Sequence, residues 1–373
     1  MKAEAKQHRE PFLRIAKRDG LVWWKAWLIR IAAVAAALLV CAGLIVLITD
    51  YNPVQIYAAM IEGSFGSSRK IWITLQKTAM LLCIALAVTP AFKMRFWNIG
   101  AEGQVLMGAL ATAGCMIAWG DKLPLAALIP IMVVFAVGAG MVWTVIPAIF
   151  RARWGTNETL FTLMMNYVAT QLVSFAITFW ENPVGSNTVG IINSATSGGW
   201  LPSLFGQRYL LNIVVVVLLT LGMFIYLQYS KQGYEIAVVG ESQNTARYIG
   251  IDVGRVIVRT MAISGAVCGL AGLMLVAGTD HTISTNTVGG QGFTAIMVSW
   301  LAKFNPVFMA LTSFLLIFLE RGSGEIATTF RLNESVSDIL TGIILFFIIG
   351  CEFFINYKIS FCKRTGKEEK LRV

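Results

Sequence analysis

Apolar runs long enough to cross a lipid bilayer recur along almost the whole chain, and they constrain its fold more than any other feature. The hydrocarbon core of a bilayer is about 30 Å thick, and a helix of about 20 apolar residues crosses it. Such runs lie at residues 31–49, 71–92, 98–119, 124–149, 158–180, 209–228, 257–278, 291–302, 305–320 and 335–357. The sequence therefore predicts an all-α, polytopic membrane bundle of about ten transmembrane helices.

Composition supports the same fold class. Of the 373 residues, 57% are hydrophobic and 13% are charged, whereas a soluble domain carries roughly 25% charged residues. The net charge of +10 does not indicate nucleic-acid binding, because the charges lie in short loops and at both ends, with no basic helix and no aromatic stacking platform. The expected partner of most of this surface is the lipid bilayer.

The basic residues predict the direction in which the chain crosses the membrane. If the N-terminus is cytoplasmic, 23 of the 30 lysines and arginines fall on the cytoplasmic side, six fall outside and Lys77 lies within a run. Cytoplasmic loops are enriched in Lys and Arg, so both termini are expected to be cytoplasmic. The predicted plan is an N-terminal segment at 1–30, a membrane domain at 31–357 and a C-terminal tail at 358–373.

Three connections between runs have features of their own. Residues 52–65 have apolar side chains at helical spacing after Asn-Pro, which predicts an amphipathic helix at the outer interface. Residues 181–208 are rich in Gly, Ser, Asn and Pro, which predicts an irregular outer loop. Residues 230–258 are polar with Ala, Val and Ile at helical spacing, and Gly240 and Gly250 can end short helices. This segment is either a docking element that enters a partner's groove or an ordinary surface loop.

Polar residues inside the runs are the candidates for a substrate path. The run at 98–119 opens with WNIGAEGQ, and a polar side chain at membrane depth faces a cavity or another helix. Lys303, Asn305 and Pro306 leave the run at 291–302 short for a crossing, and broken helices often line transport paths. For Glu102, a gate or inter-helix contact and a simple interfacial position remain open. The candidate path residues are Asn98, Glu102, Gln104, Thr162, Asn166 and Gln291.

Catalytic and metal-binding patterns are missing from the sequence. It has no phosphate-binding GxxxxGK[ST], no HExxH, no nucleophile elbow and only two histidines, and its six cysteines have no metal-ligand spacing. We expect no catalytic residue, no metal and no cofactor, which disfavours a membrane-embedded enzyme. An ion-coupled secondary transporter of a small polar solute is the alternative to an ATP-driven one. The scarcity of acidic residues at membrane depth argues against the secondary transporter.

Four segments carry a resemblance to a known family. NIGAEGQ at 98–104, TNETLFTLMMNYVA at 156–169, TARYIGID at 245–252 and LAKFNP at 301–306 resemble the permease family of bacterial ABC importers for simple sugars and nucleosides, within the branched-chain amino acid and ribose permease superfamily. The similarity runs from about Asn52 to Asn356 and is greatest to the nucleoside branch, whose binding component is a lipoprotein. The chain departs from the family's pattern at MVSWLAKFNP, where Trp300 and a lysine replace small residues and glycine-arginine.

The resemblance implies a function and a set of partners. It implies a multi-pass permease subunit of the bacterial plasma (inner) membrane that moves a nucleoside or simple sugar by alternating access. ATP would be hydrolysed on a separate ABC ATPase subunit, with a homologous second permease forming a heterodimer and an extracytoplasmic substrate-binding lipoprotein. Two halves of the bundle would be pseudo-repeats. The segment at 230–258 would hold the helix that couples to the ATPase, through Gly240, Glu241, Ser242, Asn244, Ala246 and Arg247.

Overall fold

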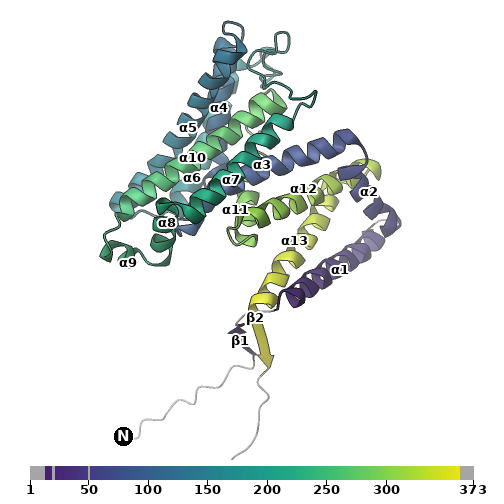
Figure 1. Ribbon diagram of the computed structural model, residues 1–373. Helices are drawn as coiled ribbons and strands as arrows, with labels where there is room; N and C mark the ends of the chain where they lie inside the picture. The colour runs from purple at the N-terminus through teal and green to yellow at the C-terminus, as the bar shows by residue number, and fades with distance from the viewer. Residues whose placement is uncertain (1–12, 19–21, 49–50, 362–373) are drawn as a thin grey trace, which may run out of the picture. The chain divides into compact units, whose positions relative to one another are not determined.

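Helices make up most of the chain in a computed structural model that describes residues 13–18, 22–48 and 51–361 (Figure 1). The packing divides the chain into two units, one formed by the described parts of 1–63 and 319–373 and the other by 64–318. The helices are α1 Trp23–Ile48, α2 Pro53–Phe65, α3 Ser68–Lys93, α4 Ala101–Trp119, α5 Leu125–Trp154, α6 Glu158–Trp180, α7 Leu210–Tyr229, α8 Lys231–Glu241, α9 Gln243–Tyr248, α10 Val253–Leu275, the π-helical turn η1 Val276–Asp280, α11 Gln291–Leu301, α12 Pro306–Thr329 and α13 Glu334–Asn356.

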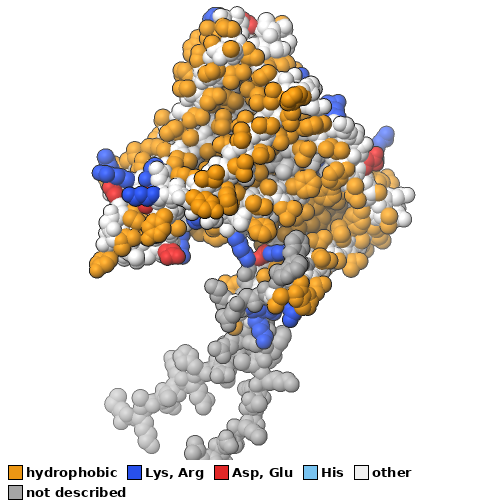
Figure 2. Space-filling view, viewed as in Figure 1, with side chains coloured by type: hydrophobic (Ala, Val, Ile, Leu, Met, Phe, Trp, Pro, Cys, Tyr) orange, Lys and Arg blue, Asp and Glu red, His pale blue; other side chains and the backbone are white. Residues whose placement is uncertain are grey.

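Eight helices within the described residues are long and apolar enough to cross a membrane, which confirms the polytopic all-α fold. Two of the predicted runs differ from full crossings. The helix α11 has 11 residues, about 16 Å at 1.5 Å per residue, and is too short. The apolar part of α13, Ile339–Ile355, is also shorter than the other spans. The space-filling view shows apolar side chains over most of the visible flank (Figure 2).

Two predicted boundaries are corrected by the structure. The first helix begins at Trp23 rather than at residue 31, and α12 continues past residue 320 to Thr329. Glu320 and Arg321 therefore lie within a helix, and the outer side predicted for Arg321 stays a prediction. Apolar runs miss these turns because backbone hydrogen bonding continues through polar residues, whereas hydropathy records only the side chains.

Close backbone contact holds α10 against α4 and α5 in the 64–318 unit. A Cβ atom at Gly108 would lie 2.5 Å from the Cα of Gly269, and one at Gly140 would lie 2.2 Å from the carbonyl oxygen of Gly265. In a bilayer the hydrophobic effect does not drive helices together, so small residues that let backbones touch are the main source of packing energy. These glycines therefore allow α10 to pack directly against α4 and α5.

In this unit, every second connection between helices lies at the same end of the bundle, because each long helix runs from one end to the other. At one end, Gln243 of α9 shares a pocket with Arg95, which follows α3, and with Arg151 at the end of α5. At the other end, the Asn193 side chain donates to the carbonyl of Met116 at 2.8 Å. The amide of Ile192 donates to the carbonyl of His281 at 2.8 Å.

The long connection at 181–208 is irregular, as predicted, but it is anchored. The indole ring of Trp200 stacks on the imidazole of His281 with ring centroids 3.8 Å apart, and the amide of Leu201 donates to the carbonyl of Ala277 at 2.9 Å. Burial, together with the nearby charge of Arg208, lowers the pKa of His281, so its ring stays neutral in the stack at physiological pH.

The described ends of the chain pair with each other in the other unit, which the sequence did not predict. The strand β1 (Leu13–Lys17) runs antiparallel to β2 (Tyr357–Phe361), with Leu13 opposite Phe361. Because β1 precedes α1 and β2 follows α13, both ends leave this unit on one side. The cytoplasmic assignment of that side stays a prediction, as do the domain plan and the pseudo-repeat. Most of the predicted segments 1–30 and 358–373 lies outside the described residues.

The packing of α10 yields a first prediction. The Gly269→Ala variant places a methyl group 2.1 Å from the carbonyl oxygen of Ala136, so α10 and α5 must separate. We expect a loss of about 1–3 kcal/mol of stability, seen as a lower melting temperature of the detergent-solubilised protein. The control is Gly138→Ala, because a Cβ atom at Gly138 of α5 has no neighbour within 4 Å. Equal melting temperatures for the two variants would contradict the contact.

Candidate functional site

The polar segment at 230–258 folds into two short helices, α8 and α9, and leads into α10. Each of the three begins at a side chain that accepts a backbone N–H. Ser230 accepts from Gly233 at 2.9 Å, Ser242 accepts from Thr245 at 3.2 Å, and Asp252 accepts from Arg255 at 3.1 Å. Ser and Asp are favoured at this position because they pair one of the free amides at a helix start. The prediction of short helices here is confirmed.

Two of the predicted coupling residues face the bundle. Ala246 is 0% exposed. A Cβ atom at Gly240 would lie 2.1 Å from the carbonyl oxygen of Lys93, so α8 rests directly on the end of α3. These two residues hold the segment in place and are not available to a partner in this structure. The half-buried Ser242 is the cap between α8 and α9.

The exposed residues of the segment are only partly those that the sequence suggested for docking. Glu241, Asn244 and Arg247 are exposed, as a docking role needs. Beside them, Tyr248 is 91% exposed and Ile249 is 50% exposed. Sequence reasoning missed both residues, although an aromatic and an aliphatic side chain directly before Gly250, which has φ +85°, mark the end of a short helix. The end of the bundle that carries α8 and α9 also gathers charged side chains (Figure 2).

An ion pair ties this segment to the centre of the bundle. The guanidinium of Arg259 on α10 donates to the carboxylate of Glu235 on α8 at 2.8 Å, and the two side chains are 35% and 17% exposed. A second pair, between Arg255 and Asp252, lies within the start of α10 and is far more exposed, at 88% and 56%. The first pair therefore joins two elements, and the second does not.

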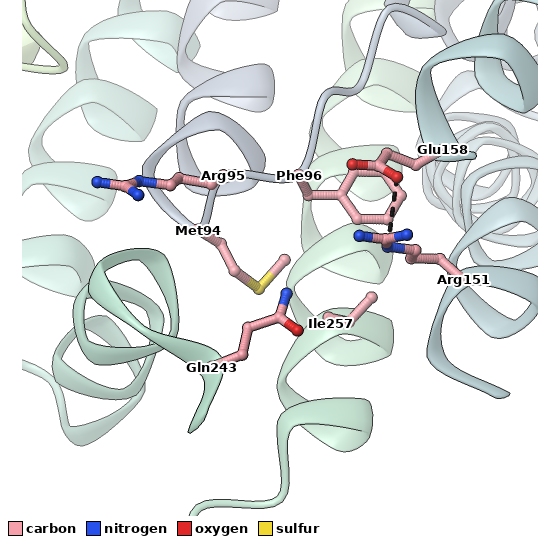
Figure 3. Close-up of a pocket in the computed structure, with 7 residues that line it drawn as sticks. All are labelled: Met94, Arg95, Phe96, Arg151, Glu158, Gln243 and Ile257. Atoms are coloured by element: carbon pink, nitrogen blue, oxygen red, sulfur yellow. Dashed lines mark ion pairs between the residues drawn. The ribbon is translucent and has the colours of Figure 1, made fainter. Parts of the chain in front are cut away.

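A small pocket lies between α9 and the helix ends beneath it (Figure 3). It encloses about 210 Å³, part of it open to solvent, and is lined by Met94, Arg95, Phe96, Arg151, Glu158, Gln243 and Ile257. Arg151 and Glu158 form an ion pair of 3.3 Å across the α5–α6 turn, and Gln243 lies opposite them. The pocket is therefore lined by one residue of α9, by the chain that follows α3, and by the helices α5, α6 and α10.

Four of the predicted path residues bind one another or the backbone. Asn98 and Gln104 exchange side-chain hydrogen bonds of 2.9 and 3.3 Å. The amide of Asn166 accepts from Gly103 and donates to the carbonyl of Ile99, both at 2.9 Å, and the hydroxyl of Thr162 accepts from Ile99 at 3.2 Å. All four are buried. Their polar groups fix the irregular chain between α3 and α4, and a role in the path stays a prediction.

Glu102 links the starts of two helices. Its carboxylate accepts the backbone N–H of Gly290 and of Gly292, each at 2.8 Å. The first amides of a helix have no partner within the helix, and the helix dipole favours an anion there. Glu102 therefore caps the half-helix α11, which supports the inter-helix contact over the interfacial position. Gln291 lies between the two glycines, and its buried side-chain oxygen accepts no hydrogen bond from the described residues.

The fold and the site define a class of protein. It is a multi-pass membrane protein with a half-helix, a glycine-packed bundle and an exposed helical segment, α8–α9, at one end. Residues 71–349 match the model of the family described as the permease component of branched-chain amino acid transport systems. The chain belongs to this family. It is a permease of the ABC transporter class, a multi-pass protein of the plasma membrane.

Individual relatives cover nearly the whole chain. The glucose ABC transporter permease protein TsgB13 of Haloferax volcanii is 28% identical over 362 residues, which is 93% of each chain. The guanosine ABC transporter permease protein NupP of Bacillus subtilis is 30% identical and covers 88% of this chain and 94% of its own. The nucleoside ABC transporter permease protein NupB of Lactococcus lactis is 28% identical, with 87% and 91% covered. No solved structure matches the chain.

The Glu235–Arg259 pair yields a second prediction. The Glu235→Gln variant leaves the Arg259 guanidinium partly buried without its anion, at a cost of about 1 kcal/mol after allowance for solvent screening. We expect amide hydrogen exchange of residues 231–248 to become about fivefold faster. The matched control is Asp252→Asn, which removes the acid of the exposed pair and keeps a capping side chain. Unchanged exchange in Glu235→Gln would show that the pair does not hold α8.

Proposed function

We propose that the chain is the membrane-spanning subunit of an ATP-driven importer that carries a nucleoside or a simple sugar by alternating access. The observation that carries the proposal is the near full-length similarity to permeases named for glucose, guanosine and nucleosides. The chain has no phosphate-binding loop of its own in its sequence. ATP hydrolysis is therefore assigned to a separate ATPase subunit.

The proposed assembly has three further proteins. An ABC permease works with an ATPase and, in an importer, with an extracytoplasmic substrate-binding protein, here a lipoprotein. We expect the second permease to be a homologous chain rather than a copy of this one. Two permease names occur for Bacillus subtilis among the relatives, NupP and NupQ, and two for Lactococcus lactis, NupB and NupC. Such pairs support a heterodimer.

The segment α8–α9 is the proposed coupling element. Its outward side chains Glu241, Asn244 and Arg247 flank the exposed Tyr248 and Ile249. An aromatic anchor ringed by polar groups is the usual composition of an energetic centre in a protein interface. Ala246, Gly240 and the Glu235–Arg259 pair hold α8 and α9 on the ends of α3 and α10. A displacement of α9 by the ATPase would thus be passed to the central helix of the bundle.

An ion-coupled secondary transporter is the alternative function, and reconstitution separates the two. The complete complex in proteoliposomes is supplied with nucleosides, pentoses and flavins in turn, with either ATP or an ion gradient. We expect uptake that needs ATP, the ATPase and the binding protein. Uptake by this chain alone, driven by a proton or sodium gradient, would favour the alternative.

The coupling assignment yields a third prediction. In the double variant Glu241→Ala and Arg247→Ala, and separately in Tyr248→Ala, we expect the ATPase to bind the permease at least tenfold more weakly, because central aromatic and charged contacts are each worth about 1.4 kcal/mol or more. Co-purification and ATP-driven uptake measure the loss. Tyr167→Ala is the control, since Tyr167 is 63% exposed on the membrane helix α6. Normal association and uptake in both coupling variants would refute the assignment.

A further inference from the structure

A polar cluster lies where the spans Ser68–Lys93 and Val253–Asp280 meet, next to the His281 ring that stacks on Trp200. Lys77 belongs to the span Ser68–Lys93, and Asp280 ends the span Val253–Asp280. Lys77 directly follows Gln76 and Asp280 directly follows Thr279, and a hydrogen bond between the Gln76 and Thr279 side chains brings these two stretches of chain together. Lys77 is half-buried and Asp280 is exposed. Ionisable side chains at membrane depth are costly, and they occur where they face a partner charge, the bundle interior or a path for a polar substrate.

The neutral side chain of Gln76, next to Lys77, has a hydrogen-bond acceptor without a partner among the described residues. Gln76 is 1% exposed, and its amide N–H donates to the hydroxyl of Thr279. That hydroxyl in turn donates to the carbonyl of Met274 at 3.3 Å. The remaining atom, the carbonyl oxygen Oε1 of Gln76, is buried and accepts no hydrogen bond from the described residues. Buried acceptors in proteins are nearly always paired, so this oxygen fits a donor from outside the described residues.

The backbone presents these groups in an unusual way. The helix α10 ends in the π turn Val276–Asp280, which carries both Thr279 and Asp280. Single π turns are rare and are frequently found at functional sites. Within the turn, a Cβ atom at Gly278 would lie 2.5 Å from the side-chain nitrogen of Asn212, so α7 fixes the turn in position. The cluster is thus built from α3 and η1 and held from a third side.

We propose that Gln76, Lys77, Thr279 and Asp280 form a subsite for the hydroxyl groups of the substrate, either a simple sugar or the ribose of a nucleoside. The proposal rests on the proposed function and names the contacts that the substrate makes during translocation. A carboxylate accepts from two neighbouring hydroxyls, an ammonium donates to a hydroxyl or ring oxygen, and the free Gln76 oxygen accepts from a third group. Vicinal hydroxyls are the feature that sugars and ribonucleosides share.

The test compares each substrate with an analogue that lacks hydroxyls. The complete transporter, in proteoliposomes with ATP and saturated binding protein, is given guanosine or 2′,3′-dideoxyguanosine, and glucose or 2-deoxyglucose. The quantity measured is the ratio of initial uptake of the parent compound to that of its analogue. Because every variant uses the same binding protein, the preference of the binding protein cancels when variants are compared.

The isosteric variant Asp280→Asn should slow uptake of the parent about tenfold and lower the ratio by a similar factor, because a hydrogen bond to a charged group is lost. Stimulation of ATP hydrolysis by the binding protein should persist. Thr279→Val is the second variant and, if Asp280→Asn does not assemble, it should still lower the ratio about threefold. Arg69→Gln is the control, because it removes an exposed cation from the first turn of the same helix.

The charge exchange Lys77→Asp with Asp280→Lys separates a substrate site from a structural ion pair. The exchange keeps two opposite charges together but reverses the donor and the acceptor, so the ratio should remain low. Recovery of the wild-type ratio would overturn the proposal, and so would a wild-type ratio near one or an equal loss for parent and analogue. A wild-type complex that takes up neither parent compound would instead count against the proposed function.

Discussion

Backbone contact between α10 and its neighbours is the constraint on which the rest of the larger unit depends. Lipid gives helices no hydrophobic reason to associate, and α10 meets α4 and α5 where Gly108, Gly140, Gly265 and Gly269 bring main chains together. The same helix carries Arg259 near its start, bound to α8, and ends in the π turn with Thr279 and Asp280. A displacement of α8 by a partner would therefore reach the polar cluster through one closely packed helix.

Several polar side chains at membrane depth form hydrogen bonds with backbone groups. No water is present in the hydrocarbon core, so every interruption of a helix needs side chains to pair the freed amides and carbonyls. Asn166 and Thr162 do this for the chain around Ile99, and Glu102 does it for the start of α11. A polar residue in a membrane helix is thus evidence for a path only when its hydrogen-bonding capacity is not already used. Gln76 and Gln291 meet that condition, and Asn98 does not.

Sequence patterns predicted the features that depend on local composition. Long apolar runs placed the spans, and helical spacing together with two glycines predicted short helices within residues 230–258. The patterns failed where the outcome depends on contacts distant in sequence. The six residues of α9 are too few for periodicity to reveal that Ala246 faces inward and Tyr248 outward. The pairing of Leu13 with Phe361 joins opposite ends of the chain, and neither strand has a pattern that predicts its partner. The hydrogen bond between Gln76 and Thr279 joins two spans in the same way.

Trp300, at the position that is expected to depart from the family's pattern, packs against other aromatic rings. The Trp300 ring stacks on Trp97 with centroids 5.5 Å apart and meets the edge of Phe92 at 6.0 Å. Trp97 lies between α3 and α4, and Trp300 lies in the last turn of α11. The larger side chain therefore fills a contact between α11 and the α3–α4 connection, at the opposite end of α11 from the Glu102 cap. The rings of Trp300 and Trp97 thus hold one end of the half-helix, and the Glu102 carboxylate holds the other.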